Sequence, residues 1–290
     1  MKLLVLTIAL ALPTAAQAEP LNVQASNDVL AMFAQRLAGD AATVTMPVPD
    51  GIDPATWQPR IAAIAAVQDA GLIVLNGAGY EGWSTRVSLP RARTVDTTHG
   101  MDAELIHLAG QSHSHGAGPT HSHDGVAPVV WLDFSLAARQ AGAIAAALTR
   151  ALPDAPVAAN LAALQTDLAD LDAEAKALGA AMQGQTLLVW QPGYEYFGRA
   201  YGIPLREVTF DAAEPPSPAQ LAALDAAVAD TQARLMLWDA APPPDTATAL
   251  AARGIMPVIF TTAANPPEGA DVLGMLQANL AALRAALDPA

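Results

Sequence analysis

Apolar and polar positions along the first hundred residues alternate between two spacings, one typical of strands and one of helices. Short apolar runs bounded by turn-forming residues predict strands over 21–26, 44–48, 72–75 and 94–97. Longer segments with apolar positions three and four apart predict helices over 27–37 and 54–70. A strand-helix repeat of this kind predicts a parallel sheet with helices on both faces.

The strand-helix repeat stops between His99 and Ala127, where glycine, serine and histidine dominate the sequence. Helical spacing resumes over 133–152 and again over 155–182, the longest helical stretch in the chain. Its apolar positions keep one face, while aspartates and other charged residues occupy the other. The apolar positions are Leu161, Leu164, Leu168, Leu171 and Leu178.

A second strand-helix repeat follows the long helix. Strands are predicted over 186–190, 207–210, 235–238 and 257–261, and a last helix over 271–287. We therefore predict an α/β fold with two four-stranded parallel-sheet lobes joined by one long rigid helix. The predicted boundaries are 19–152 for the N-terminal lobe with its His-rich loop at 99–127, 153–183 for the linking helix, and 184–290 for the C-terminal lobe.

The first eighteen residues have the pattern of a signal peptide. Lys2 precedes a run of about ten apolar residues, and Ala16-Gln17-Ala18 is a small-residue cleavage site. The run is shorter than the roughly 20 residues that span a bilayer. The sequence thus predicts an exported, periplasmic protein.

Charge and cysteine content limit the partners and the metal ligands that the chain can have. The chain has 14 Lys and Arg against 28 Asp and Glu, a formal net charge of −14. Such a surface argues against nucleic acid or anionic lipid as a partner, since both bind basic surfaces. The chain has no cysteine, so a metal would have to be held by His, Asp or Glu.

Five short motifs occur in order along the chain. They are Asp53-Pro54-x-x-Trp57-x-Pro59, Asn76-Gly77-x-Gly79-x-Glu81-Gly82-Trp83, Trp131-Leu132-Asp133, Tyr196-Phe197-x-x-x-Tyr201-Gly202 and Asn279-Leu280-x-x-Leu283-x-x-Ala286-Leu287. In that order and spacing the chain resembles the zinc and manganese solute-binding proteins of ABC transporters, over essentially its whole length after residue 18. The resemblance implies two α/β lobes joined by a rigid helix, with metal bound in the cleft between them.

The chain departs from this family at the metal ligands that the resemblance implies. Ala55, Val129 and Gln191 stand where the family has histidines, and Asp239 fits the fourth position, a carboxylate. Zinc needs about four nitrogen, sulfur or oxygen donors, and alanine and valine supply none. The inherited site is therefore predicted to be disabled.

Histidine is confined to one part of the chain. All six histidines lie between positions 99 and 123, and two His-Ser-His triplets occur close together. Several imidazoles in one flexible tract can gather around one ion, and zinc is the ion favoured by neutral nitrogen donors. The predicted metal ligands are His107, His113, His115, His121 and His123, with His99 and Asp239 as further candidates. A solvated loop whose histidines bind nothing is the alternative.

Sequence motifs for catalysis are weak or missing. Gly77 to Gly82 spells a dinucleotide fingerprint, but it follows the third strand and Pro90 cuts short the helix that should follow. No nucleophile elbow, zinc-protease pair or P-loop is found. The chain is not predicted to be an enzyme.

These features favour a monomeric periplasmic receptor for a metal, most simply Zn²⁺, that docks on an ABC permease in the inner membrane. Metal would bind mainly through the His-rich loop. One alternative is a zinc-buffering or metallochaperone protein with a disabled cleft. Another is a receptor for a non-metal solute held by Gln191, Trp131 and Asp239.

Overall fold

The computed structural model describes residues 19–108, 112–113, 121–122, 125–211 and 214–287. The N-terminal half forms a four-stranded parallel sheet in the order β2-β1-β3-β4. Its strands are β1 (Leu21–Ala25), β2 (Ala42–Thr45), β3 (Leu72–Leu75) and β4 (Thr94–Asp96). The predicted signal peptide lies outside the described residues.

The C-terminal half repeats this topology. Its parallel sheet has the order β10-β9-β11-β12, so in both sheets the second strand along the chain lies at one edge and the fourth at the other. The strands are β9 (Leu187–Val189), β10 (Leu205–Glu207), β11 (Leu235–Trp238) and β12 (Met256–Ile259). The prediction of two four-stranded parallel sheets is confirmed.

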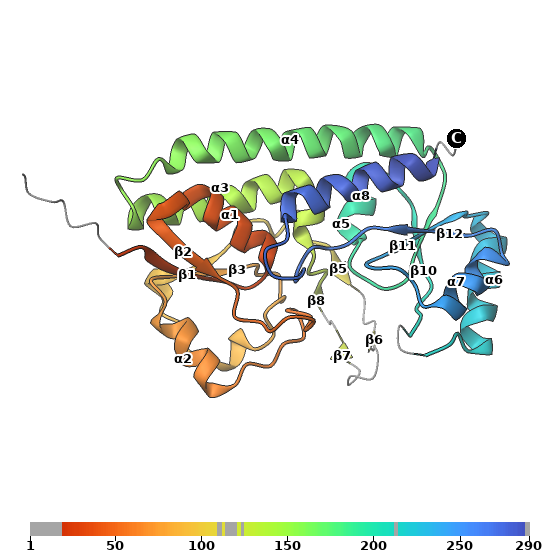
Figure 1. Ribbon diagram of the computed structural model, residues 1–290, viewed down its shortest axis with the longest axis horizontal. Helices are drawn as coiled ribbons and strands as arrows, with labels where there is room; N and C mark the ends of the chain where they lie inside the picture. Colours follow the sequence, from red (N-terminus) through yellow and green to blue (C-terminus); the bar gives the residue numbers. More distant parts are fainter. Residues whose placement is uncertain (1–18, 109–111, 114–120, 123–124, 212–213, 288–290) are drawn as a thin grey trace, which may run out of the picture.

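One long helix runs along both sheets. Helix α4 (Val157–Ala181) extends over the full width of the molecule and packs on helices from each half (Figure 1). The other helices are α1 (Asp28–Ala38), α2 (Ile61–Asp69), α3 (Phe134–Ala151), α5 (Glu195–Tyr201), α6 (Pro218–Thr231), α7 (Pro244–Ala251) and α8 (Val272–Leu287). Among the described residues, no helix combines the length and apolarity needed to cross a bilayer.

Side chains cap the first turn of several helices, among them α1 and α3. The Asn27 carboxamide oxygen accepts a hydrogen bond from the Leu30 amide at 2.9 Å. The Asp133 carboxylate accepts from the amides of Ser135 and Leu136. These bonds satisfy amides that have no partner within the helix, which explains why α1 and α3 start within one residue of the predicted positions.

The helix predicted over 54–70 is half wrong. Helix α2 begins only at Ile61. Before it, the Asp53 carboxylate accepts from the Ala55 amide and the Asp53 carbonyl accepts from the Thr56 amide, so the chain turns. Asp side chains favour such turns by bonding the backbone two residues on. The turn places Ala55 in a loop.

Two observed strands begin two residues earlier than predicted. Strand β2 covers Ala42–Thr45 where 44–48 was predicted, and β10 covers Leu205–Glu207 where 207–210 was predicted. Pairing decides their place, because Ala42 is aligned with Leu21 and Leu205 with Leu187. Val208 and Phe210 are buried although they lie outside β10. Their amides still donate to the carbonyls of Val189 and Trp190, at 2.9 and 3.4 Å, so the chain continues beside β9 beyond the end of β10.

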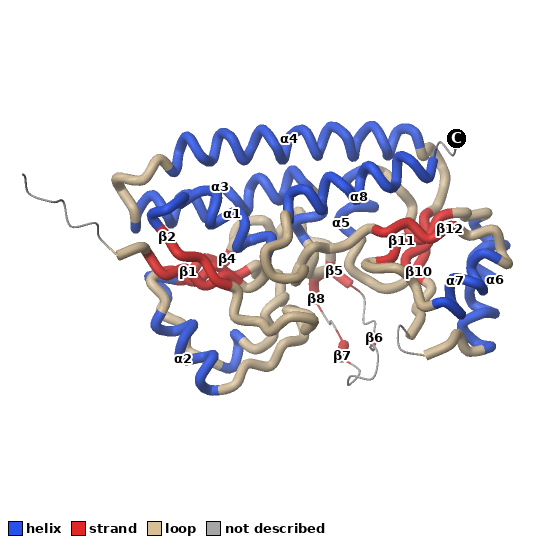
Figure 2. The backbone as a smooth tube through the Cα atoms, viewed as in Figure 1, coloured by secondary structure: helices blue, strands red, loops and turns tan. Residues whose placement is uncertain are grey.

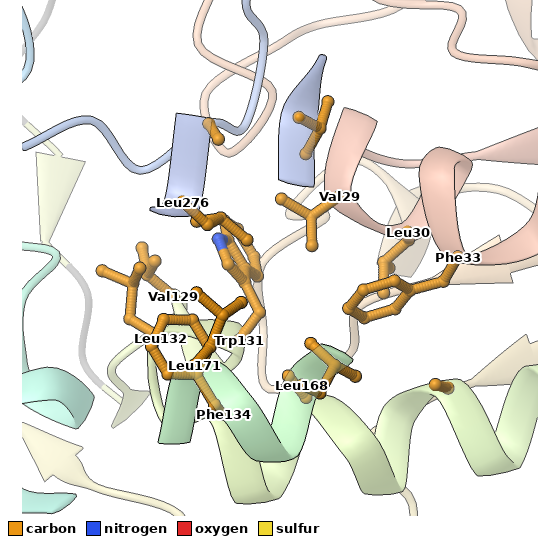
Figure 3. Packing of buried hydrophobic residues seen from close by; sticks show 14 of the residues in the cluster. Val29, Leu30, Phe33, Val129, Trp131, Leu132, Phe134, Leu168, Leu171 and Leu276 are labelled. Carbon is orange, nitrogen blue, oxygen red and sulfur yellow. The ribbon is translucent and has the colours of Figure 1, made fainter. Parts of the chain in front are cut away.

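A continuous hydrophobic core joins the two halves. Figure 3 shows Leu168 and Leu171 of α4 together with Val29 and Phe33 of α1 and Leu276 of α8. All five side chains are at most 2% exposed. The two sheets are thus held by shared packing on α4 as well as by chain connectivity.

Two short antiparallel pairs interrupt the α/β pattern between β4 and α3. Strand β5 (His107–Leu108) pairs with β8 (Gly125–Val126), and β6 (Ser112–His113) pairs with β7 (His121–Ser122). They project from the middle of the molecule, between the two sheets (Figure 2).

Candidate functional site

A cavity of about 370 Å³ lies between the two halves, at the carboxyl ends of their strands. Ligands of open parallel sheets bind at this edge, because helix N-termini and loops converge there. The first half contributes Gly51, Ile52, Asp53, Pro54, Ala55, Tyr80, Leu108, Pro128 and Val129. The second half contributes Trp190, Gln191, Pro192, Gly193, Asp239, Thr261, Thr262, Ala264 and Asn265.

The structure brings the four family ligand positions together. Ala55, Val129, Gln191 and Asp239 all line this cavity, although up to 184 positions of sequence separate them. Ala55 and Val129 offer only hydrocarbon. The cavity therefore keeps one carboxylate and one carboxamide where the resemblance implies four metal ligands.

The protein itself uses both oxygens of Asp239. The Gln191 amide nitrogen donates to Oδ2, and the Thr262 amide donates to Oδ1 at 3.3 Å. The Tyr194 hydroxyl lies 2.9 Å from Oδ1 and 3.0 Å from the Phe260 carbonyl oxygen, so it can donate to either. Asp239 is thus built into a hydrogen-bond network.

Burial raises the pKa of Asp239 above its ordinary value, and the nearby charge of Asp53 adds to the rise. The hydrogen bonds from Tyr194 and Thr262 oppose it by stabilising the carboxylate. No group of three or more His, Asp or Glu side chains placed to hold a metal is found among the described residues.

Trp131 does not contact the cavity, contrary to its prediction as a cleft residue. Its side chain is fully buried and its indole nitrogen donates to the Thr262 carbonyl at 2.8 Å. It packs edge-on against Tyr80 at 5.5 Å between ring centroids and lies beside Leu276 (Figure 3). Trp131 therefore positions the Thr262 loop and the Tyr80 ring.

The histidines differ in where the structure places them. His99 follows β4, is exposed and is not among the residues that line the cavity. His107 is also exposed, but its neighbour Leu108 lines the cavity. In the pairing of β6 with β7, His113 is aligned with His121. His115 and His123 lie outside the described residues.

Two cavity residues were missed by the sequence analysis. Tyr80 is 1% exposed, and its hydroxyl has no hydrogen-bond partner among the described residues. Asn265 donates to the carbonyls of Pro49 and Ile52 at 3.0 and 2.7 Å, which fastens a loop of the second half to the first. The side-chain oxygen Oδ1 of Asn265 is buried and has no hydrogen-bond partner in the described part of the chain.

Only a weak signal pointed to these two residues. Tyr80 lies inside the glycine motif and Asn265 precedes two prolines, patterns that predict turns and say nothing of a ligand. Their proximity depends on how the loops of the two halves meet.

Comparison with known proteins gives one family. Residues 23–286 match the family model described as zinc-uptake complex component A, periplasmic. The high-affinity zinc uptake system protein ZnuA of Paracoccus denitrificans is 28% identical over 261 residues, which cover 78% of each chain. The manganese-binding lipoprotein MntA of Halalkalibacterium halodurans is 28% identical over 194 residues, 66% of this chain and 61% of that protein.

Solved structures share the fold. The metal-dependent lipoprotein YcdH from Bacillus subtilis has a TM-score of 0.78 at 21% identity, covering 91% of this chain and 98% of that one. The Zn(II)-bound ZnuA-like domain of Streptococcus pneumoniae AdcA has a TM-score of 0.76 at 20% identity, with the same coverage. At such identities the likeness establishes the two-lobed architecture alone.

Proposed function

Because the chain belongs to the family of periplasmic zinc-uptake components, whose members are solute-binding proteins of metal transporters and not enzymes, we propose that it is the metal receptor of an ABC importer. Its metal ligands are the histidines of segment 107–123 and not the family positions of the cleft. Zn²⁺ is the proposed cargo, since imidazole nitrogen suits zinc better than manganese.

The proposed location and partner follow from the family and from the N-terminus. The chain is exported by its first eighteen residues and works as a monomer in the periplasm. There it docks on an ABC permease of the inner membrane. The formal net charge of −14 is compatible with attracting cations to this surface.

The observation that carries the proposal is the composition of the cleft. Ala55 and Val129 supply no donor, and both oxygens of Asp239 already accept hydrogen bonds from the protein. Zinc bound there would lack most of its coordination shell. Tight metal binding therefore needs ligands from elsewhere in the chain.

The histidine segment starts at the mouth of the same cavity. Leu108 of β5 lines the cavity, and β5 pairs with β8, so both ends of the segment leave the body at one place. Within the segment, β6 pairs antiparallel with β7 and aligns His113 with His121. Aligned positions of an antiparallel pair lie about 5 Å apart, a separation from which two imidazoles can bind one ion.

The test replaces histidines without removing the segment. Zn²⁺ is titrated calorimetrically into metal-free protein, comparing the unaltered chain with His113→Ser/His115→Ser, with His121→Ser/His123→Ser and with all four replaced. His99→Ser is the matched control. Either pair should weaken binding by about a hundredfold or more, because two imidazoles alone hold zinc poorly. Replacing both pairs should add little, and the control should bind as the unaltered chain does.

Two other outcomes would overturn parts of the proposal. Losses that simply add, with two ions per chain, would indicate separate sites and a zinc-buffering protein. Affinity that does not depend on any of these histidines would show that the segment binds no metal. Imidazoles must be unprotonated to bind zinc, so affinity should also fall between about pH 7 and 5.5.

A further inference from the structure

The interlobe cavity has its own chemistry, separate from that of the histidine segment. We propose that it binds a small organic cation, a primary ammonium or amidinium group carried on an apolar body, with the charged group at Asp239. This site does not depend on the metal-binding histidines proposed above.

The charges at the cavity favour a cation. Asp53 and Asp239 line it, and Lys, Arg and His are absent from its lining residues in the described part of the chain. Oδ2 of Asp239 accepts a hydrogen bond from Gln191, and a carboxylate oxygen has two lone pairs, so it can accept from a second donor. An ammonium or amidinium group can donate to it, and such charge-assisted hydrogen bonds are roughly twice as strong as neutral ones.

Two residues that line the cavity carry a buried polar atom without a partner among the described residues, the Tyr80 hydroxyl and the Asn265 side-chain oxygen Oδ1. Leaving such groups without a partner costs about 1 to 3 kcal/mol each. Both atoms are covered by protein in this structure, so a ligand's N–H group would reach them only after the side chains beside them moved.

The remaining wall favours an organic body over a bare metal ion. Ala55, Leu108 and Val129 present hydrocarbon, and Trp190, stacked on Trp238 at 5.0 Å, presents an indole. A hard or borderline metal ion needs several oxygen or nitrogen ligands, which this wall lacks. A volume of about 370 Å³ is within the range of small-molecule pockets.

The test uses probes of one shape that differ in charge. Benzylammonium, benzyl alcohol and benzoate are titrated into the full mature chain in the presence of a chelator, followed by calorimetry and tryptophan fluorescence. Butylammonium and 1-butanol form a second pair without an aromatic ring. Each cation should bind at least about tenfold more tightly than its neutral counterpart, and benzoate should bind least.

Variants assign the binding to this cavity. Asp239→Asn should weaken both cations by about tenfold or more, whereas Asp230→Asn, at an exposed position of α6 away from the cavity, should not. Ala55→Phe fills the cavity without touching the carboxylate and should abolish binding. Thermal unfolding of each variant checks that it is folded.

The outcomes separate this proposal from the metal proposal. Cations that bind no better than their neutral counterparts, or that bind Asp239→Asn and Ala55→Phe as well as the unaltered chain, overturn the cation site. The variant lacking His113, His115, His121 and His123 should keep full cation affinity. Its loss of zinc binding, or its failure to lose it, bears on the histidine segment alone.

Discussion

Asp239 shows how the metal ligands that the family site needs differ from the side chains that this chain supplies. It is the one carboxylate at the four family positions, and Gln191 and Thr262 donate to its two oxygens. A carboxylate in this setting can organise a pocket or balance the charge of a cation. It is poorly placed to start a zinc site, because its neighbours at Ala55 and Val129 offer no donor.

Asp239→Ala should therefore change zinc affinity by less than about tenfold, equivalent to 1.4 kcal/mol. The variant should fold, since the Tyr194 hydroxyl keeps the Phe260 carbonyl as a partner at 3.0 Å. Calorimetric titration with Zn²⁺ measures the effect. Loss of all tight zinc binding would show that the cleft still holds the metal.

Glu81 is the second residue whose environment predicts a measurable effect. It is buried, and its carboxylate accepts from the amides of Asn76 and Gly77 at 2.6 and 3.1 Å. Burial dominates over these hydrogen bonds and raises the pKa of Glu81 from 4.5 to about 7. A folded-state pKa above the unfolded one means that the stability due to this group is complete below about pH 4.5 and is lost as the pH rises through about 7.

The free energy of unfolding should thus be lower at pH 8 than at pH 5.5, by about 2 kcal/mol from Glu81. Asp28, whose pKa is raised to about 6 by burial and by the charge of Asp50, adds in the same direction at lower pH. Urea denaturation at the two pH values measures the slope. Glu81→Gln should flatten it, while Glu214→Gln, at an exposed position, should leave it unchanged. An equal slope in both variants would contradict the assignment.

At the scale of elements, helix α4 holds the two lobes at a fixed spacing. Its buried positions include Leu164, Leu168 and Leu171 on the side of the first sheet and Leu178 and Gly179 toward the second. The most demanding contact is at Gly179, where a Cβ would lie 2.0 Å from the Tyr201 carbonyl oxygen at the end of α5. Glycine is required here because backbone approaches backbone.

Gly179→Ala should destabilise the protein by about 1 to 3 kcal/mol, since α4 or α5 must move to relieve the overlap. Gly142→Ala in α3 is the matched control. Nothing lies within 4 Å of its added Cβ, so the better helix propensity of alanine should stabilise by up to about 1 kcal/mol. Thermal or urea unfolding of both variants tests the opposite signs. A neutral Gly179→Ala would show that α4 is not tightly seated on α5.

In the molecule as a whole, the shared hydrophobic core and the hydrogen bonds between the halves hold the two lobes together as one unit. Near the cavity, hydrogen bonds join the halves at three places: the Trp131 indole to Thr262, the Asp28 amide to Ala264, and the Asn265 amide to Pro49 and Ile52. Two more lie at α5, where the hydroxyls of Tyr196 and Tyr201 accept from the amides of Ile106 and Phe134. The two halves are therefore held together both around the cavity and beside α5.

Unfolding should accordingly be a single cooperative transition. Urea curves followed by far-ultraviolet circular dichroism and by tryptophan fluorescence should coincide, because neither lobe can expose its half of the core alone. Separate midpoints for the two probes would mean that the lobes unfold independently and that α4 acts only as a linker.

The sequence by itself determined the fold class and the two main sheets. Periodicity of apolar residues predicted eight strands in two parallel sheets and the long helix between them, whereas the short strands β5 to β8 were not predicted. These signals are local or repeat every few residues, so a single chain displays them. The motifs likewise identified Ala55, Val129, Gln191 and Asp239 as members of one site.

Only the tertiary structure decided which other residues line that site. Trp131 is conspicuous in sequence but buried, whereas Tyr80 and Asn265 line the cavity although no local pattern marks either as a ligand contact. The strand bounds near 44–48 and 207–210 depended on pairing with β1 and β9, which no local pattern encodes. Contacts between loops of different lobes depend on how the sheets are held on α4, and that arrangement exists only in the folded chain.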